Sequence, residues 1–380
     1  METTSPADIE KKKETSGHYF PHTKEMKPVV YEPTEQDIRL TDEIRQFLNE
    51  TEIPYEEDKE IFGLFHLNEG KLQLRYVNSA HHGIDNTKRY GKGHEGIDKD
   101  YFVNISQWNV NRDIRTIWIF DFEMLQTNPA VDLDGKTLNP RFRRQWEVIK
   151  NTVRTATGHI RHRFYARDCE VREIGNDLLR PFLDRNCFYG YRSANKNLGL
   201  FLKKDKGGFK KGTLVMVYTY GFCYFSNKKH QEDPAIEIIR VSTLIGCQVI
   251  GGASKCLKHF LRRYQTLNIN GREVEVDRLI FYCDASHNDG RAMSSSALGF
   301  NFVEWKGGGF MNVFLEDVDE VYERPDGKKI AIKGKKGDIQ HRKPLAHKRI
   351  MELIRDHKIV SVPNAGTSVW TIRKSEYPYE

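Results

Sequence analysis

The chain of 380 residues lacks any run of about 18 apolar residues, the length that a membrane-spanning helix needs. Its N-terminal segment contains no apolar stretch of the kind that secretory signal peptides carry. Cysteine is scarce: there are six, and no two form a C-x-x-C pair, which argues against zinc knuckles and disulfide frameworks. We therefore expect reduced cysteines, no membrane partner and a cytoplasmic location, which for a viral protein means the cytoplasm of the host cell.

The composition is that of a folded protein, because 38% hydrophobic and 11% aromatic residues are enough to fill cores. At roughly 100–200 residues per domain, the length predicts two or three domains. Alternating strand-like and helix-like segments predict the α/β class (α+β, with mixed sheets). We expect a polar tail over 1–35, α/β units over 36–160 and 161–315, and a small basic element with a helix and a hairpin over 316–380.

The apolar pattern locates the expected elements. Helical spacing predicts helices at 141–154, 176–186, 253–265 and 345–357. Runs with strand character include 61–67, 71–77, 116–120, 236–241 and 278–284. Thr41, followed by two acidic residues, predicts the start of the first helix. Asn68–Gly70 predicts a tight turn, and Pro363–Gly366 predicts the turn of a C-terminal hairpin.

The net charge of +7 is small, but the charges are segregated along the chain. Residues 1–60 carry 8 basic and 16 acidic side chains, whereas 139–167 carry 8 and 1, 196–211 carry 6 and 1, and 324–350 carry 10 and 2. This is the electrostatic footprint of a phosphate-binding surface if the segments converge, and of solvated loops if they do not. We expect DNA as the partner, with RNA as the alternative. The candidate contacts are Arg141, Arg143, Arg144, Arg161, Arg163, Lys203, Lys204, Lys210, Lys211, Lys333, Lys335, Lys336, Arg342 and Lys343.

A glycine turn between a predicted strand and a predicted helix lies at 248–255, with the sequence QVIGGASK. Small residues there let backbone amides approach a phosphate at the helix N-terminus. The spacing Gln-x-x-Gly-x-Ala resembles the pyrophosphate loop of the GNAT acyltransferase fold, and an LGF sequence at 298–300 is similar to a later turn of that fold. The resemblance implies acyl-CoA as cofactor, although an ordinary strand–helix turn would use the same residues. The implied contacts are Gln248, Gly251, Gly252, Ala253, Ser254 and Lys255, with Asp284, Tyr282 or Ser254 near the reacting atoms.

The first block has the expected order helix, hairpin, His-rich loop, buried strand, helix. This order resembles the PD-(D/E)XK nuclease fold of very-short-patch repair endonucleases and some phage homing endonucleases. Such a site needs carboxylates on the hairpin to hold Mg²⁺, which activates the attacking water. Phe65 and His66 stand near the first of these positions and Arg75 near the second. An arginine there repels the cation, so the nuclease site is degenerate in sequence.

The histidine of the nuclease pattern is matched by His81 or His82. An active Mg²⁺ site would need substitute carboxylates, for which Asp85, Glu69 and Glu60 are the nearest candidates. The same histidines, with His94 and Glu95, would alternatively bind a transition metal or be plain surface-loop residues. No metal is therefore assigned from the sequence.

Short segments from about residue 40 to residue 372 resemble, in order, phage homing endonucleases that combine the two folds, which implies a virus-encoded, DNA-associated protein. Three hypotheses follow. The first is a DNA-binding protein with a degenerate nuclease site, favoured because no basic segment falls on the hairpin; the aromatic and basic residues of 188–192 would then stack on bases. The others are an active Mg²⁺-dependent endonuclease, and a GNAT-type acyltransferase or base-modifying enzyme acting on nucleic acid.

Overall fold

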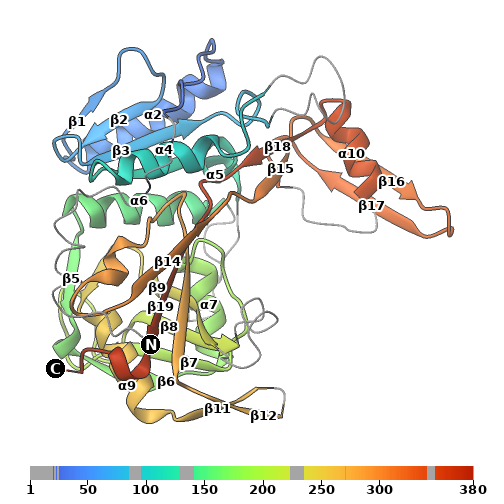
Figure 1. Ribbon diagram of the computed structural model, residues 1–380. Coiled ribbons are helices and arrows are strands. Elements are labelled where there is room, and N and C mark those ends of the chain that lie inside the picture. Colours follow the sequence, from blue (N-terminus) through green and yellow to red (C-terminus); the bar gives the residue numbers. More distant parts are fainter. Residues whose placement is uncertain are drawn as a thin grey trace, which may run out of the picture.

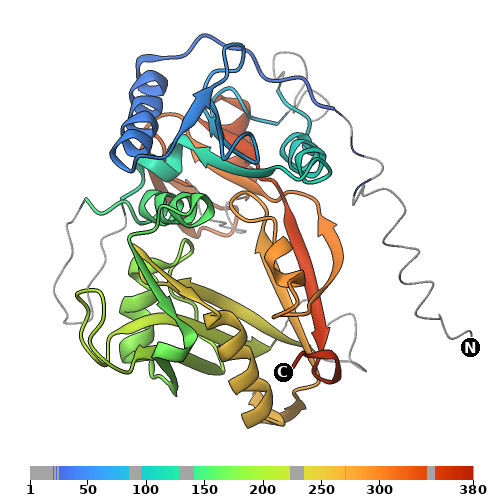
Figure 2. The same cartoon turned by 90° about the vertical axis from the view of Figure 1, so that its left-hand side faces the viewer.

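The computed structural model of the protein describes residues 20, 23, 25–84, 96–127, 141–222, 235–269, 271–339 and 347–379. Over these ranges the chain forms helices and several β-sheets, which confirms the predicted mixed α/β class (Figures 1 and 2). None of the helices in the described ranges combines the length and the apolar character needed to cross a membrane.

The first unit is built on a four-stranded sheet of order β1-β2-β3-β4, in which β3 and β4 are parallel and the other pairs antiparallel. Its elements are α2 (Glu35–Glu50), β1 (Tyr55–Glu57), β2 (Leu64–Leu67), β3 (Leu72–Val77), α4 (Tyr101–Val110), β4 (Arg115–Phe120), α5 (Asp121–Leu125) and α6 (Arg144–Thr157). The predicted turn at Asn68–Gly70 joins β2 to β3.

Helix α2 begins earlier in the chain than predicted. Thr34 is its N-cap, and a reciprocal capping box joins Thr34 to Asp37, whose carboxylate accepts the Thr34 backbone N–H at 2.8 Å. Thr41 instead lies inside the helix and donates to the Asp37 carbonyl at 2.9 Å. The reason is local, because only Thr34 has an acidic residue three positions later to complete the box.

The second unit is built on a seven-stranded sheet of order β14-β19-β13-β9-β8-β7-β6. All neighbours in it are antiparallel except β9 and β13, which are parallel. The elements are β5 (His162–Tyr165), η1 (Ala166–Asp168), β6 (Cys169–Glu173), α7 (Asn176–Asn186), β7 (Lys196–Leu202), β8 (Leu214–Phe222), β9 (Ala235–Thr243), β10 (Cys247–Ile250), α9 (Gly252–Arg263), β11 (Thr266–Ile269), β12 (Arg272–Glu275), β13 (Arg278–Asp284), η2 (Arg291–Ser294), β14 (Asn301–Lys306), β19 (Thr367–Arg373) and η4 (Lys374–Glu376).

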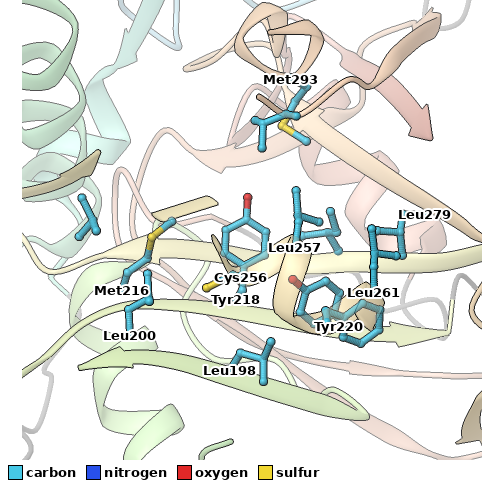
Figure 3. Close-up of a cluster of buried hydrophobic side chains, with 14 of the residues drawn as sticks. Leu198, Leu200, Met216, Tyr218, Tyr220, Cys256, Leu257, Leu261, Leu279 and Met293 are labelled. Carbon is cyan, nitrogen blue, oxygen red and sulfur yellow. The ribbon is translucent and has the colours of Figure 1, made fainter. Parts of the chain in front are cut away.

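The two faces of this sheet are covered differently. Helix α9 buries its apolar side against one face, with Leu257 and Leu261 beside Tyr220 (Figure 3). The ring of Phe260, on the same helix, stacks on Tyr220 with centroids 3.7 Å apart. Helix α7 packs Phe182 and Leu183 against the other face over β7 and β8. This leaves the second face open over β9, β13, β19 and β14.

The parallel strands β9 and β13 separate part-way along their length. They are paired from Ala235 to Ile238 and from Arg278 to Phe281, and beyond these residues the ladder stops. After β9 the chain turns, and β10 pairs in parallel with β5 instead. Ligands of open α/β sheets bind where parallel strands part at their carboxyl ends, so this divergence marks a place to look for a site.

A C-terminal element lies between β14 and β19 in the chain. It comprises β15 (Phe310–Phe314), β16 (Val318–Glu323), β17 (Lys329–Gly334), α10 (His347–Arg355) and β18 (Ile359–Pro363). The predicted C-terminal hairpin is not formed, because β18 pairs with β15 while β19 joins the seven-stranded sheet. Each strand is held by a different core: Val362 packs with the first unit, and Trp370 packs in the second.

Backbone contacts join the first unit to the loop after β13. The Trp118 N–H on β4 donates to the Ser286 carbonyl at 2.8 Å, and the Arg115 guanidinium donates to the His287 carbonyl at 3.0 Å. Helix α6 faces both units, since Trp146 packs into the core of the first while Thr152 lines a cleft in the second. The first unit therefore fixes the loop that leaves the diverging strands.

Candidate functional site

The expected nuclease centre is filled by Arg75 on β3. Its Nε donates to the Gln73 side-chain oxygen at 3.0 Å, and its guanidinium lies 5.5 Å from the centre of the Trp118 ring. Burial lowers the pKa of Arg75. The adjoining cavity has only about 20 Å³, and Arg75 and His82 line it while no carboxylate does. The residues at this position do not fit Mg²⁺, and the described ranges hold no group of three or more His, Cys, Asp or Glu side chains that would bind a metal.

Of the four residues proposed for nuclease chemistry, the three that the structure describes do not form one site. His82 is buried, burial lowers its pKa to about 4, and its Nδ1 lies 2.9 Å from the Asn78 carbonyl. His81 is exposed and stacks on the Tyr31 ring at 4.4 Å. Glu69 lies in the turn at the opposite end of β3, and a six-residue strand separates its ends by roughly 20 Å. Asp85 lies outside the described residues.

A cleft of about 1010 Å³ lies on the open face of the seven-stranded sheet. Its floor is formed by β9 and β13 around the point where they diverge, and by β19 and β14. Its walls come from α6 and from residues 186–192. Asp284 and Tyr282, expected near reacting atoms, both line this cleft, whereas Ser254 does not.

A chain of polar groups from both units lies at one end of the cleft. His287 Nε2 lies 3.2 Å from Glu123 Oε1, and His287 Nδ1 lies 3.4 Å from Asp284 Oδ2. The Tyr189 hydroxyl donates to the same Asp284 oxygen. The Phe188 ring packs on the imidazole with centroids 4.3 Å apart. Glu123 comes from α5 of the first unit, so the site is completed across the junction between the units.

The charges of this network are set by burial and by mutual contact. Burial opposes the imidazolium of His287, yet the Glu123 charge and hydrogen bonds with Asp284 and Glu123 raise its pKa to about 10. Burial would raise the pKa of Asp284, but the hydrogen bonds from His287 and Tyr189 lower it to about 2. The charge of Asp284 and the hydrogen bond to it raise the pKa of the half-exposed Tyr189 above its usual range. At neutral pH the network thus holds an imidazolium next to a carboxylate, with a protonated tyrosine facing the cleft.

The strand, glycine turn and helix predicted at 248–255 are present, and side chains of this loop make contacts within the protein. Gln248 pairs through its backbone with β5, and Gly252 starts α9 where a Cβ would lie 2.7 Å from Met216 Sδ. The Lys255 ammonium donates to the Ala166 and Cys169 carbonyls at 2.8 and 2.5 Å.

The neighbouring residues of the loop are engaged in the same way. The Ser254 hydroxyl lies 3.1 Å from the Tyr377 hydroxyl, and a Cβ on Gly251 would contact Ala166 at 3.4 Å. Ala253 packs against the core of the second unit. None of the six predicted residues lines the cleft.

Two of the three basic segments do converge, around β5. The Lys203 ammonium donates to the Arg167 carbonyl at 2.8 Å, and the His162 ring packs edge-on against Phe209 at 5.0 Å. The exposed Tyr165 ring has the Arg167 and Lys206 cations 4.9 and 5.4 Å from its centre. We call this surface the basic patch, and it comprises Arg161, Arg163, Tyr165, Arg167, Lys203, Lys204, Lys206, Lys210, Lys211 and Lys255.

The other predicted phosphate contacts lie elsewhere. Arg143 pairs with Glu43 at 2.7 Å, and the Arg144 guanidinium donates to the Asp184 carbonyl at 3.2 Å, so both serve intramolecular packing. Arg141 lies two residues before Arg143. Lys333, Lys335 and Lys336 belong to the C-terminal element, whose β16–β17 hairpin lies on the opposite side of the molecule from β5 (Figure 1). Arg342 and Lys343 lie outside the described residues.

Comparison of the chain with protein-family models and with curated proteins gave no match. The function is therefore inferred from the geometry and the chemistry of the chain itself.

The sequence pattern did not reveal two of the four network residues, Glu123 and His287. A signal for both was present, because Glu123 follows the buried strand β4 by three residues and His287 follows β13 by three. Polar residues just after buried strands collect at the carboxyl edge of a sheet. The sequence could not predict that these edges of two different sheets, one from each unit, lie in contact.

Proposed function

We propose that the chain is a nucleic-acid-binding protein, with DNA as its favoured partner and a nuclease-like first unit that does not cut. The observation that carries the proposal is the basic patch, in which Arg167 and Lys206 bring cations from two distant segments to the exposed Tyr165 ring. Lys206 also pairs with Asp168. Cations on such a surface bind phosphates by releasing counterions, and an aromatic face stacks on bases.

The architecture supports the same proposal. The order α-β-β-β-α-β and the sheet of the first unit agree with a PD-(D/E)XK-like relative, and Arg75 at its centre favours loss of the metal chemistry. The diverging parallel pair beside a glycine turn supports a GNAT-like second unit. We take phage DNA metabolism as the setting, on the strength of the resemblance in sequence.

Binding is tested by fluorescence anisotropy with labelled duplex DNA and RNA over a range of salt concentrations. The double variant Lys204→Glu/Lys211→Glu removes two cations of the basic patch. We expect it to weaken binding and to reduce the slope of log K against log salt by about 0.9 for each phosphate of duplex DNA that the variant no longer neutralises. The matched control is Lys328→Glu/Lys329→Glu on the C-terminal element, which should behave like the unmodified protein. Absence of binding at low salt would refute the proposal.

The absence of cleavage is tested separately, with supercoiled plasmid and with Mg²⁺ or Mn²⁺. The plasmid should stay intact because Arg75 occupies the place of a metal ligand. Nicking that co-purifies with the protein and is abolished in the His82→Ala variant would instead establish an active endonuclease.

A group-transfer enzyme acting on nucleic acid is the second candidate, favoured by the proton-carrying network in the cleft. Its acyl-donor form predicts thermal stabilisation by acetyl-CoA and a mass shift in nucleosides from treated DNA. If neither the stabilisation nor the mass shift is observed, the acyltransferase candidate is rejected.

A further inference from the structure

The cleft is a feature that the basic patch does not use. Its volume of about 1010 Å³ lies at the upper end of the roughly 300–1,000 Å³ typical of small-molecule sites. It is lined by aromatic rings, cations and hydrogen-bonding groups together. This combination suits a flat, polar and negatively charged ligand.

Aromatic faces and cations alternate around the cleft. Tyr189 is 54% exposed, and the Arg240 guanidinium lies 5.6 Å from the centre of its ring. Tyr282 on β13 has the Lys306 ammonium 5.0 Å from its ring centre. A nucleobase stacks on such rings, and neighbouring cations strengthen the contact.

The cleft also offers a cation for a phosphate. Arg192 is exposed in the cleft wall, where its charge acts on the Glu237 carboxylate. Arg240, Arg278 and Lys306 add further cations to the lining, beside the carboxylates of Asp284 and Glu304. Guanidinium groups bind phosphate oxygens through two parallel hydrogen bonds, and the fixed fork suits a phosphate next to a stacked base.

The Tyr189 hydroxyl is held in a fixed direction. It donates to Asp284, which contacts His287, which in turn contacts the buried Glu123. A hydroxyl fixed in this way is an oriented hydrogen-bonding group for the edge of a base or for a sugar oxygen, since its rotation has already been restricted before binding.

The cleft wall and the basic patch meet through Gly246. The Gly246 N–H donates to the Asn151 side chain of α6 at 2.8 Å, and the Gly246 carbonyl accepts the His162 N–H of β5 at 3.1 Å. Asn151 and Thr243 line the cleft, while β5 carries the patch residues Arg163 and Tyr165. One residue therefore connects the cleft wall to the strand that carries part of the patch.

We infer that the cleft is a nucleotide-binding site, which takes one nucleotide unit of the nucleic acid held on the basic patch. This rests on the proposed function for the source of the nucleotide. The ring of Tyr189 stacks on the base, its hydroxyl orients the base or the sugar, and Arg192 meets the phosphate. Glu123 is a positioning residue that acts through His287 and Asp284.

The test is calorimetric titration of the full chain with the four deoxynucleoside monophosphates and, separately, with coenzyme A. Tyr189→Phe keeps the ring and removes only the hydroxyl, so we expect binding about three- to tenfold weaker, as for removal of one hydrogen bond. Arg192→Glu should weaken phosphate-bearing ligands more than the corresponding nucleosides. Tyr322→Phe, on β16 of the C-terminal element, is the matched control and should change nothing. Circular dichroism verifies that each variant is folded.

The outcomes separate this inference from the proposed function. Lys204→Glu/Lys211→Glu should weaken duplex binding and leave mononucleotide binding unchanged. If no mononucleotide binds while DNA still does, the cleft inference is overturned and the proposed function stands. If coenzyme A alone binds, the cleft is an acyl-donor site and the inference is again overturned. If mononucleotides bind but no nucleic acid does, the proposed function is overturned. The part of the inference that takes the nucleotide from a bound strand is then overturned as well.

Discussion

At the scale of single residues, His287 combines burial with a positive charge. Glu123 from α5 and Asp284 from β13 face its two ring nitrogens, Tyr189 reaches it through Asp284, and Arg115 is bonded to its carbonyl. Burial alone would make this imidazole neutral, so its charge depends on the two carboxylates. The protonation state of this cleft residue therefore depends on Glu123, a residue of the first unit.

Replacing Glu123 by Gln should lower the pKa of His287 by about 1–3 units, the usual effect of one adjacent opposite charge. Because the pKa of His287 is raised to about 10 in the folded chain, its stabilisation is complete below its ordinary pKa and disappears as pH rises toward 10. NMR of the histidine ring protons across pH 5–11 measures the shift directly.

The control for this titration is Glu320→Gln, which removes a carboxylate paired with Arg349 in the C-terminal element. It should leave the His287 curve unchanged. A His287 that titrates near 6.5 in the unmodified protein would contradict the charge assignment.

The candidate site shows what sequence can reach at this scale. The resemblance to the GNAT fold implies Asp284, Tyr282 or Ser254 near the reacting atoms, and the first two line the cleft while Ser254 does not. Tyr189 was selected as a stacking residue and lines the same cleft. Glu123 could not be linked to them, because its contact with His287 joins residues 164 positions apart.

At the scale of elements, the turn from β10 into α9 is tightly packed. A Cβ on Gly252 would lie 2.7 Å from Met216 Sδ, 2.9 Å from Val249 Cγ1 and 3.1 Å from Leu200 Cδ1. Gly252→Ala should therefore lower the free energy of unfolding by about 1–3 kcal/mol through overpacking. Urea denaturation measures the change. Gly307→Ala is the control, since the atom nearest to its added Cβ is 3.7 Å away. Equal stability of the two variants would show that the residues around Gly252 rearrange to fit a methyl group without cost, which would contradict the prediction.

Elements with a local signal were predicted well, and those defined by distant partners were not. Helices α7 and α9 and strand β13 agree with the sequence pattern within one or two residues, because each has one apolar face or a buried run. Helix α4 was missed, since its sides are buried by different neighbours and it shows no single apolar stripe. The C-terminal hairpin was wrong because Pro363–Gly366 turns the chain between two sheets rather than within one.

At the scale of the whole molecule, the units are joined by shared packing as well as by the site. One buried cluster combines Phe102 and Phe120 of the first unit with Val313 and Val362 of the C-terminal element. Helix α6 packs against the first core and walls the cleft of the second unit. Such continuity predicts that the first unit acts as a structural support for the cleft rather than as an independent module.

If this is correct, the two units unfold together. Hydrogen exchange followed by mass spectrometry in increasing urea should show that β4 of the first unit and β13 of the second become unprotected in one transition. Glu123→Gln should lower the midpoint for both by the same amount, because removing one of the two carboxylates that face His287 costs about 1–4 kcal/mol, the free energy that corresponds to a pKa change of about 1–3 units. Glu320→Gln, whose ion pair lies within the C-terminal element, should move neither midpoint to that extent. Two separate transitions, with only β13 responding to Glu123→Gln, would contradict this prediction. The units would then be independently stable, and the contact between them would affect only the cleft.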